Sequence, residues 1–397
     1  MLAPAALAVL ILAAFVLYRP ALTGSFHFDD APNLDALSTV VDLDSALAFV
    51  FGGDAGPLGR PIALASFLPQ AEAWPQNPRP FLLTNLLIHL VNGVLIAALT
   101  YQLARVHSER IPRPALFAAV VAGLWLILPI NATASLMVVQ RMTTLAALFV
   151  LAGLVLYTLG RLRAASSPRT GLLLMTFGVV AFTPLAAFTK ENGALLPLFA
   201  LVLEATLLRG AAGPLPGSVR AGRALLLGIP TLLLAGYVMS RIPPFADPYG
   251  MSPFGLYERL TTQALALLEY LRIAIAPTPS AITPFYDDYP LLGEHVPGLA
   301  GAALLTGWGV LVALAVWQRR RMVALSFAVL WFVAGHSLES TVLPLELFYL
   351  HRNYLPSYAV AFAIVWLFMA RETPIGSSVR FLLAPSMVLI ALVLFET

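Results

Sequence analysis

The chain is built from long apolar runs separated by short polar segments, and this pattern limits its fold more than any other feature. Hydrophobic residues make up 59% of its 397 residues and charged residues only 11%, and the mean hydropathy is +0.86. A soluble globular domain carries roughly a quarter charged residues. Because backbone groups in lipid must be satisfied within the chain, the composition predicts an all-α polytopic integral membrane protein in contact with the lipid bilayer.

We expect about eleven transmembrane helices from these runs. Several runs are shorter than the ~20 residues that cross a hydrocarbon core, so their limits are approximate. They lie at about 2–18, 81–103, 114–130, 136–159, 171–188, 193–208, 224–240, 298–317, 323–338, 357–370 and 381–395.

Arginines gather in five loops between alternate runs, so eleven crossings would place all five loops on one side of the membrane. The positive-inside rule makes that side cytoplasmic, with the N-terminus inside and the C-terminus outside, in the periplasm if this is a bacterial inner membrane. This placement explains the pI of 9.3 without a nucleic-acid partner. The arginines are Arg105, Arg110 and Arg113; Arg161, Arg163 and Arg169; Arg209, Arg220 and Arg223; Arg319, Arg320 and Arg321; and Arg371 and Arg380.

Two segments allow a second interpretation. Residues 259–276 are apolar but contain several charges, and we expect a helix lying in the outer interface rather than a twelfth crossing. The first run is either a membrane span or a cleaved signal peptide, although Met1–Pro4 lacks the positive residues that usually begin a signal peptide.

We expect one membrane domain over residues 1–397, with no separate soluble domain. Its long loops would face outward, namely a first outer loop at about 19–80 and an outer segment at about 241–297. Within the first loop, the amphipathic stretches 43–51 and 60–74 predict helices at the interface. A site should lie on this outer face, because the inner loops are short.

Two adjacent acids, Asp29 and Asp30, stand in the first outer loop. They are either a working site beside the bilayer or a solvated pair, one of which caps a helix that starts near Ala31.

Two cationic positions are candidates for binding a phosphate. Lys190 is the only lysine of the chain and precedes Glu191, so the pair either caps a tight turn or presents a cation and an orienting acid to a substrate. Arg141 lies within the fourth run and, if buried, would need an anionic partner such as Asp29, Asp30, Glu191 or a ligand phosphate.

Two further stretches carry polar groups at expected span ends. The stretch from His351 to Tyr354 either forms an interfacial belt or grips a lipid phosphate through His351 and Arg352. His89 shares a helix face with Asn85, where a hydrogen bond between helices is the simpler interpretation.

In chain order, these outer stretches resemble polytopic glycosyltransferases of the GT-C superfamily, most closely the transmembrane and tetratricopeptide-repeat-containing O-mannosyltransferases and their bacterial relatives. The resemblance rests on Phe28-Asp29-Asp30, Arg60-Pro61, Asn85–Asn92, Val139–Phe149, Lys190-Glu191, Leu256–Gln263, Tyr270–Arg272 and His351–Pro356. It implies a GT-C-like bundle with interfacial helices on the outer face.

The chain departs from that pattern in two places. It ends at Thr397, directly after the last run, so we expect no repeat domain and leave the acceptor open. Where the family tends to show His-Pro followed by Glu, this chain reads Leu128–Thr133.

The resemblance implies transfer of a sugar from a polyprenyl-phosphate donor to a hydroxyl of a protein or glycan on the outer face, with inversion and with Asp29 or Asp30 as general base. The expected donor-phosphate and substrate-binding residues are Lys190, Glu191, Arg141, Arg259, Arg272, His351, Arg352, Tyr354, Arg60 and His89.

No cofactor is expected, since the chain has no cysteine and no histidine cluster, although adjacent carboxylates leave Mg²⁺ or Mn²⁺ open. Two other classes stay open: a transporter or flippase of lipid-linked sugars, and a non-catalytic scaffold for assembly of surface glycans.

Overall fold

A computed structural model of the chain describes residues 2–27, 29–211, 213–242, 254–283, 286, 289–291 and 298–371. Within these ranges the regular elements are all helices, as the composition predicts. In chain order the α-helices are α1 (Leu2–Tyr18), α2 (Asp30–Leu34), α3 (Leu43–Phe51), α4 (Pro61–Ala65), α5 (Arg79–Val106), α6 (Pro114–Ile127), α7 (Ala132–Leu136), α8 (Arg141–Arg163), α9 (Pro168–Val180), α10 (Phe182–Ala187), α11 (Leu196–Ala205), α12 (Gly217–Ser240), α13 (Leu256–Ile275), α15 (Gly298–Gln318), α16 (Val323–His336) and α17 (Ser357–Met369).

Six helical stretches in the described part of the chain are long and apolar enough to cross a membrane, and a bent pair formed by α6 and the segment Pro129–Leu136 makes up to seven. These apolar helices indicate a membrane protein. The number eleven stays a prediction, because three expected spans are short helices: α11 has 10 residues, α16 has 14 and α17 has 13. The last expected span, 381–395, lies outside the described residues.

The fourth apolar run does not form one helix from residue 136 onward, as the sequence suggests. Its long helix, α8, begins at Arg141, and the residues before it form a turn. Polar side chains from elsewhere stabilise that turn: the Asn85 amide donates to the carbonyls of Met137 and Val138, and the Val139 amide donates to Asp30. Arg141 therefore lies in the first turn of α8.

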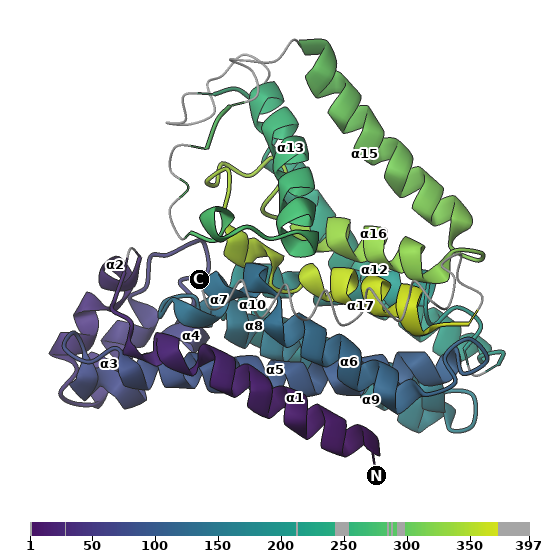
Figure 1. The fold of residues 1–397 in the computed structure, drawn as a ribbon, viewed down its shortest axis with the longest axis horizontal. Coiled ribbons are helices and arrows are strands. Elements are labelled where there is room, and N and C mark those ends of the chain that lie inside the picture. Colours follow the sequence, from purple (N-terminus) through teal and green to yellow (C-terminus); the bar gives the residue numbers. More distant parts are fainter. Residues whose placement is uncertain are drawn as a thin grey trace.

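Helices α1, α5, α6, α8 and α9 run alongside one another as a bundle, and α15 stands at an angle away from it (Figure 1). Helix α8 packs against α5 and α9, α5 packs against α6, and α6 packs against α1. Helix α16 packs against both α15 and α17. Helix α13 crosses the direction of α5, α6 and α8 in Figure 1 and is not among the six candidate spans of the described residues, so its position in the outer interface stays a prediction.

The described arginine-bearing loops meet at one end of the bundle, where His107 Nε2 lies 2.9 Å from the Leu207 carbonyl. The Arg371 amide donates to the Arg110 carbonyl, and Glu204 pairs with both Arg161 and Arg223. Desolvation, and then the charges of Arg320 and Arg319, lower the pKa of Arg209. The shared location is the one that the positive-inside rule requires of these loops.

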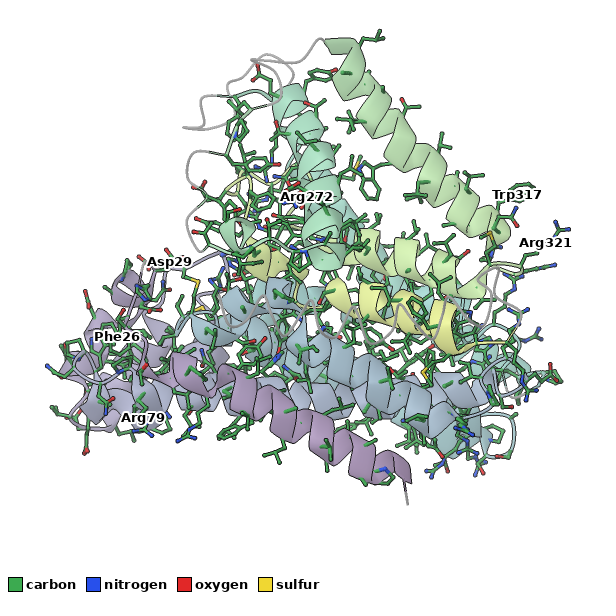
Figure 2. All side chains as sticks on the ribbon, in the orientation of Figure 1. Phe26, Asp29, Arg79, Arg272, Trp317 and Arg321 are labelled. Carbon is green, nitrogen blue, oxygen red and sulfur yellow. The ribbon has the colours of Figure 1, made fainter. Side chains whose placement is uncertain are left out.

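The predicted outer segments gather at the opposite end, where Figure 2 shows Asp29 and Arg79 far from Trp317 and Arg321. Helix α3 has the bounds expected from the amphipathic stretch, because Asp42 caps it by accepting a hydrogen bond from the Ser45 amide. The expected helix over 60–74 is divided: α4 begins with Pro61 directly after Arg60, as expected for proline at the first helical position, but it ends at Ala65, and a 3-10 helix, Leu68–Ala73, follows.

Candidate functional site

The two acids of the first outer loop have different environments. Asp30 is 1% exposed, and its two carboxylate oxygens accept hydrogen bonds from the backbone amides of Val139 and His27, at 2.7 and 2.8 Å. Burial raises the pKa of the Asp30 carboxyl, against the opposing effect of these two hydrogen bonds. Asp30 therefore ties the outer loop to the turn before α8.

Asp29, by contrast, lines a small cavity of about 10 Å³ with Gln140, Tyr349 and His351. Its backbone carbonyl accepts a hydrogen bond from the Asn33 side chain at 2.8 Å, which fixes the start of α2. The cavity has room for about one water molecule. Of the two acids, Asp29 is thus the one whose position suits contact with a bound molecule.

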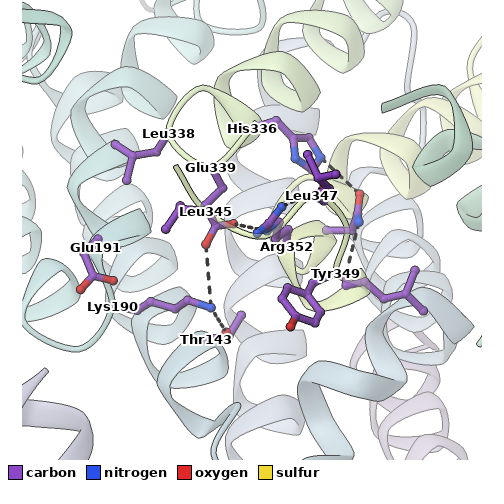
Figure 3. A network of polar contacts seen from close by, with 12 residues as sticks. Thr143, Lys190, Glu191, His336, Leu338, Glu339, Leu345, Leu347, Tyr349 and Arg352 are labelled. Carbon is purple, nitrogen blue, oxygen red and sulfur yellow. Dashed lines mark hydrogen bonds and ion pairs between the residues drawn. The ribbon is translucent and has the colours of Figure 1, made fainter. Parts of the chain in front are cut away.

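Lys190 is buried between α10 and the short 3-10 helix Glu191–Leu195. Its ammonium donates to the Thr143 hydroxyl at 2.9 Å and lies 3.9 Å from a carboxylate oxygen of Glu339 (Figure 3). Burial lowers the pKa of Lys190 to about 8, although the charge of Glu339 acts in the opposite direction.

Glu339 also faces Arg352, with 3.7 Å between its second carboxylate oxygen and the Arg352 Nε (Figure 3). Desolvation raises the pKa of the Glu339 carboxyl, but the nearby charges of Lys190 and Arg352 lower it. The pKa therefore lies below its ordinary value. Sequence reasoning missed this acid. One signal for it exists: Glu339 is the only charged residue between Arg321 and Glu346.

Lys190 and Arg352 line a second cavity of about 30 Å³, together with Thr143, Asn192 and His351. His351 belongs to the linings of both cavities and so connects Asp29 to the two cations. Burial, and then the charges of Lys190 and Arg352, hold the pKa of His351 well below its ordinary value, so its ring is neutral at pH 7.

The sequence suggested that Glu191 orients Lys190. In the structure Glu191 pairs with Arg60 instead. The guanidinium of Arg60 donates from Nη2 to a Glu191 oxygen at 2.9 Å and from Nε to the same oxygen at 3.1 Å. Arg60 takes a left-handed backbone conformation with φ 52°, which is strained for a residue with a side chain. Gly56 packs on this pair so closely that an added Cβ would lie 2.3 Å from a Glu191 oxygen.

Arg141 is buried as expected. Its guanidinium donates to Asn85, Gln70 and the backbone carbonyls of Ser66 and Phe81, over distances of 2.7 to 3.1 Å. These acceptors are neutral, so none of the expected acids, Asp29, Asp30 and Glu191, is among these hydrogen-bond partners of Arg141. Arg141 instead joins the first outer loop to α5 and α8.

His89 and Tyr354 are joined in an internal hydrogen-bond network, and Tyr354 also lines the cavity of Lys190 and Arg352. The Tyr354 hydroxyl is 2.7 Å from His89 Nδ1, and it accepts a hydrogen bond from Asn92 at 3.1 Å. His89 Nε2 lies 3.0 Å from the carbonyl of Leu126. His89 is fully buried, and the network realises the helix–helix hydrogen bonds that its spacing suggested.

The two arginines of α13 lie in different surroundings. Arg259 is buried and donates to the backbone carbonyls of Thr341, Leu345 and Glu339, which anchors the loop that carries the Glu339 side chain. Arg272 pairs with Glu269 on the same helix at 2.6 Å and is partly exposed. Figure 2 shows Arg272 beside α13. The contacts of the described residues do not connect Arg272 to Lys190.

Within the described part of the chain, no three His, Asp or Glu side chains come together as a metal site. The second acidic pair, Asp287 and Asp288, lies outside it. A further cavity of about 110 Å³ lies among α2, α3 and the loop before α4, with Asn33 and Asp54 in its lining.

The chain matches no protein-family model, no curated protein and no solved structure. Its class therefore rests on its own features, which are those of a helical membrane protein with a buried charge cluster at the end opposite its arginine loops.

Proposed function

We propose that this protein is a membrane glycosyltransferase that moves a sugar from a polyprenyl-phosphate donor to an acceptor hydroxyl on the outer face of the membrane. One observation carries the proposal: Asp29 and the cations Lys190 and Arg352 line two cavities that share His351. Transfer from a lipid phosphate needs a base for the acceptor and cations for the leaving group, and this arrangement supplies both at one end of the bundle.

In the proposed reaction, the acceptor oxygen attacks the anomeric carbon of the donor sugar. The bond from that carbon to the phosphate oxygen breaks, and the electron pair leaves with the polyprenyl phosphate. Asp29 takes the acceptor proton and later releases it to water. Lys190 and Arg352 stabilise the charge that grows on the phosphate, and attack from the opposite side inverts the anomeric centre.

Other residues would position this machinery. Asp30 holds the turn before α8, Arg141 holds the first outer loop, and Arg259 holds the loop of Glu339. Both cavities have room for one or two water molecules, so donor entry requires the loops around His351 to part. The acceptor, a protein or a glycan, would approach from the side of the first outer loop.

Substitution of the two acids tests the proposal. Purified protein is incubated with a panel of labelled polyprenyl-phosphate sugars, and hydrolysis and transfer are both measured. We expect Asp29→Asn to lower kcat ~100-fold or more in a protein that stays folded and inserted in the membrane. Asp30→Asn should mainly lower the melting temperature, because loss of its charge-assisted hydrogen bonds costs about 1–3 kcal/mol.

Full activity of the Asp29→Asn variant would contradict the assignment of the base. If only Asp30→Asn abolishes transfer in a protein that stays folded, the base is Asp30. Movement of labelled lipid across liposomes without hydrolysis or transfer would favour the flippase alternative.

A further inference from the structure

Glu339 stands between the two cations of the site and contacts neither closely. Its carboxylate oxygens lie 3.9 Å from the Lys190 ammonium and 3.7 Å from the Arg352 Nε. All three side chains are less than a tenth exposed. Within the described part of the chain, the carboxylate oxygen that faces Arg352 has no hydrogen-bond partner, and neither has the Arg352 Nε.

A second acid in the chain shows what a closely bonded arrangement looks like. Glu204 also bridges two cations, but it accepts hydrogen bonds from Arg161 at 2.9 Å, Arg223 at 2.6 Å and Tyr157 at 2.8 Å. Both clusters contact α8. Glu339 faces Lys190, which donates to Thr143 of α8, and Glu204 pairs with Arg161 of α8. Eighteen residues at about 1.5 Å each separate Thr143 from Arg161, so the clusters lie roughly 27 Å apart.

The contrast indicates that Lys190 and Arg352 are not arranged to fit Glu339. Two buried cations facing one loosely held acid leave a net positive charge, and that charge lies beside a cavity. Buried charges are stable only when they are paired and hydrogen-bonded, so a second anion with several acceptor oxygens would be attracted there. A phosphate offers such oxygens in more directions than a carboxylate.

The backbone and the side chain of Glu339 are held in different ways. Arg259 donates to the Glu339 carbonyl at 3.1 Å and to two further carbonyls of the same loop, so the backbone is fixed. Among the described residues, the carboxylate has the two long contacts with the cations, a hydrogen bond from Asn192 and the nearby charge of His336. Rotation of the side chain can therefore withdraw the carboxylate without moving the loop.

We propose that Glu339 is an internal competing anion, which neutralises Lys190 and Arg352 while the site is empty and is displaced from them when a donor phosphate binds. This inference rests on the proposed function and adds regulation of phosphate binding and release. Glu339 weakens the affinity for phosphate and so accelerates release of the polyprenyl-phosphate product.

The test compares binding of farnesyl phosphate to the purified wild-type protein and to the Glu339→Gln variant at pH 7. Removing a competing charge about 4 Å from both cations should tighten binding about tenfold or more. In a transfer assay the same variant should show a lower KM, stronger inhibition by product and a lower kcat. Unchanged or weaker binding by a folded Glu339→Gln variant would overturn the proposal.

Two variants control for structural effects. Glu204→Gln removes an acid between two cations at the far end of α8 and should leave the affinity for farnesyl phosphate unchanged. Glu339→Asp keeps the negative charge but shortens the side chain, so its affinity should lie between those of the wild type and of Glu339→Gln. If Glu339→Gln does not fold, Glu339→Asp serves as the test. Binding of farnesyl phosphate to Glu339→Asp that is equal to or weaker than binding to the wild type then overturns the proposal.

Farnesol, which lacks the phosphate, separates charge from packing. Its binding should be the same in all these variants, and an equal tightening for farnesol would contradict the competition of charges. Because the binding assay needs no transfer, its outcome is independent of the sugar. If Glu339→Gln binds farnesyl phosphate more tightly but the wild-type protein transfers no sugar, the proposed transferase function is contradicted. The proposal that Glu339 competes with phosphate is then still supported.

Discussion

The buried arginines Arg141 and Arg352 satisfy their guanidinium groups in different ways. Arg141 donates to neutral acceptors at 2.7 to 3.1 Å and stacks on the Phe67 ring. Arg352 donates to the carbonyl of Leu347 but leaves its Nε without a hydrogen-bond partner. A fully bonded arginine fixes structure, whereas one with an unused donor beside a cavity retains capacity to bind an anion.

The lowered pKa of Lys190 leads to a prediction about pH. The side chains that face it are Thr143, Glu339, Glu191, Arg60 and Arg352, with His351 beside them. His351 is neutral and Glu339 ionised from pH 7 upward, because their pKa values lie below their ordinary ranges. The charge of Lys190, with a pKa of about 8, is therefore lost as the pH rises through 8.

A polyprenyl-phosphate sugar is a phosphodiester that does not titrate in this range, so its affinity should follow the ammonium of Lys190. We expect binding to weaken about tenfold between pH 7 and pH 9, since one pH unit above a pKa leaves about a tenth of the group protonated. The measurement is the Kd at several pH values. The Lys190→Arg variant, which stays charged, should give a flat profile, and a flat profile for the wild type would contradict the prediction.

At the scale of elements, α8 and α9 pack through glycines. A Cβ built on Gly178 would lie 2.6 Å from the carbonyl oxygen of Gly153, and one on Gly160 would lie 2.6 Å from that of Gly171. The obstacles are backbone atoms, which cannot rotate away. Small residues allow helices in a membrane to approach this closely.

We therefore expect Gly178→Val to push α9 away from α8 and to lower stability by about 1–3 kcal/mol, as overpacking does. Thermal unfolding in detergent measures the change. Gly228→Val on α12 is the matched control, because nothing lies within 4 Å of a Cβ there. Since valine has a better helix propensity than glycine, an equal loss of stability in both variants would show that the contact of α8 with α9 is not the cause.

The sequence predicts elements well where the signal is local. The amphipathic stretch 43–51 predicts α3, and Pro61 marks the start of α4. The start of α8 was not predictable, because Asn85 and Asp30 stabilise the preceding turn from distant parts of the chain. The partner of Lys190 was missed for the same reason: Glu191 is adjacent in sequence, but Glu339 is adjacent in space.

Over the whole molecule, charge is separated between the two ends of the bundle. The arginine loops meet at one end, and the first outer loop, Lys190 and Glu339 meet at the other. A bilayer favours such a molecule in the orientation that leaves the arginines in the cytoplasm. In that orientation the candidate site would face the outer side of the membrane.

The absence of cysteine from the chain allows a direct test of this orientation. Val41, which is 86% exposed in the first outer loop, and Ser166, which is exposed in an arginine loop, are changed singly to cysteine. In bacterial cells with an intact inner membrane, an impermeant maleimide should label the Val41→Cys variant. It should label Ser166→Cys only after that membrane is disrupted, while the unmodified protein gives no background. The reverse pattern would place the site in the cytoplasm, and labelling of both variants in intact cells would show that the two ends are not separated by a membrane.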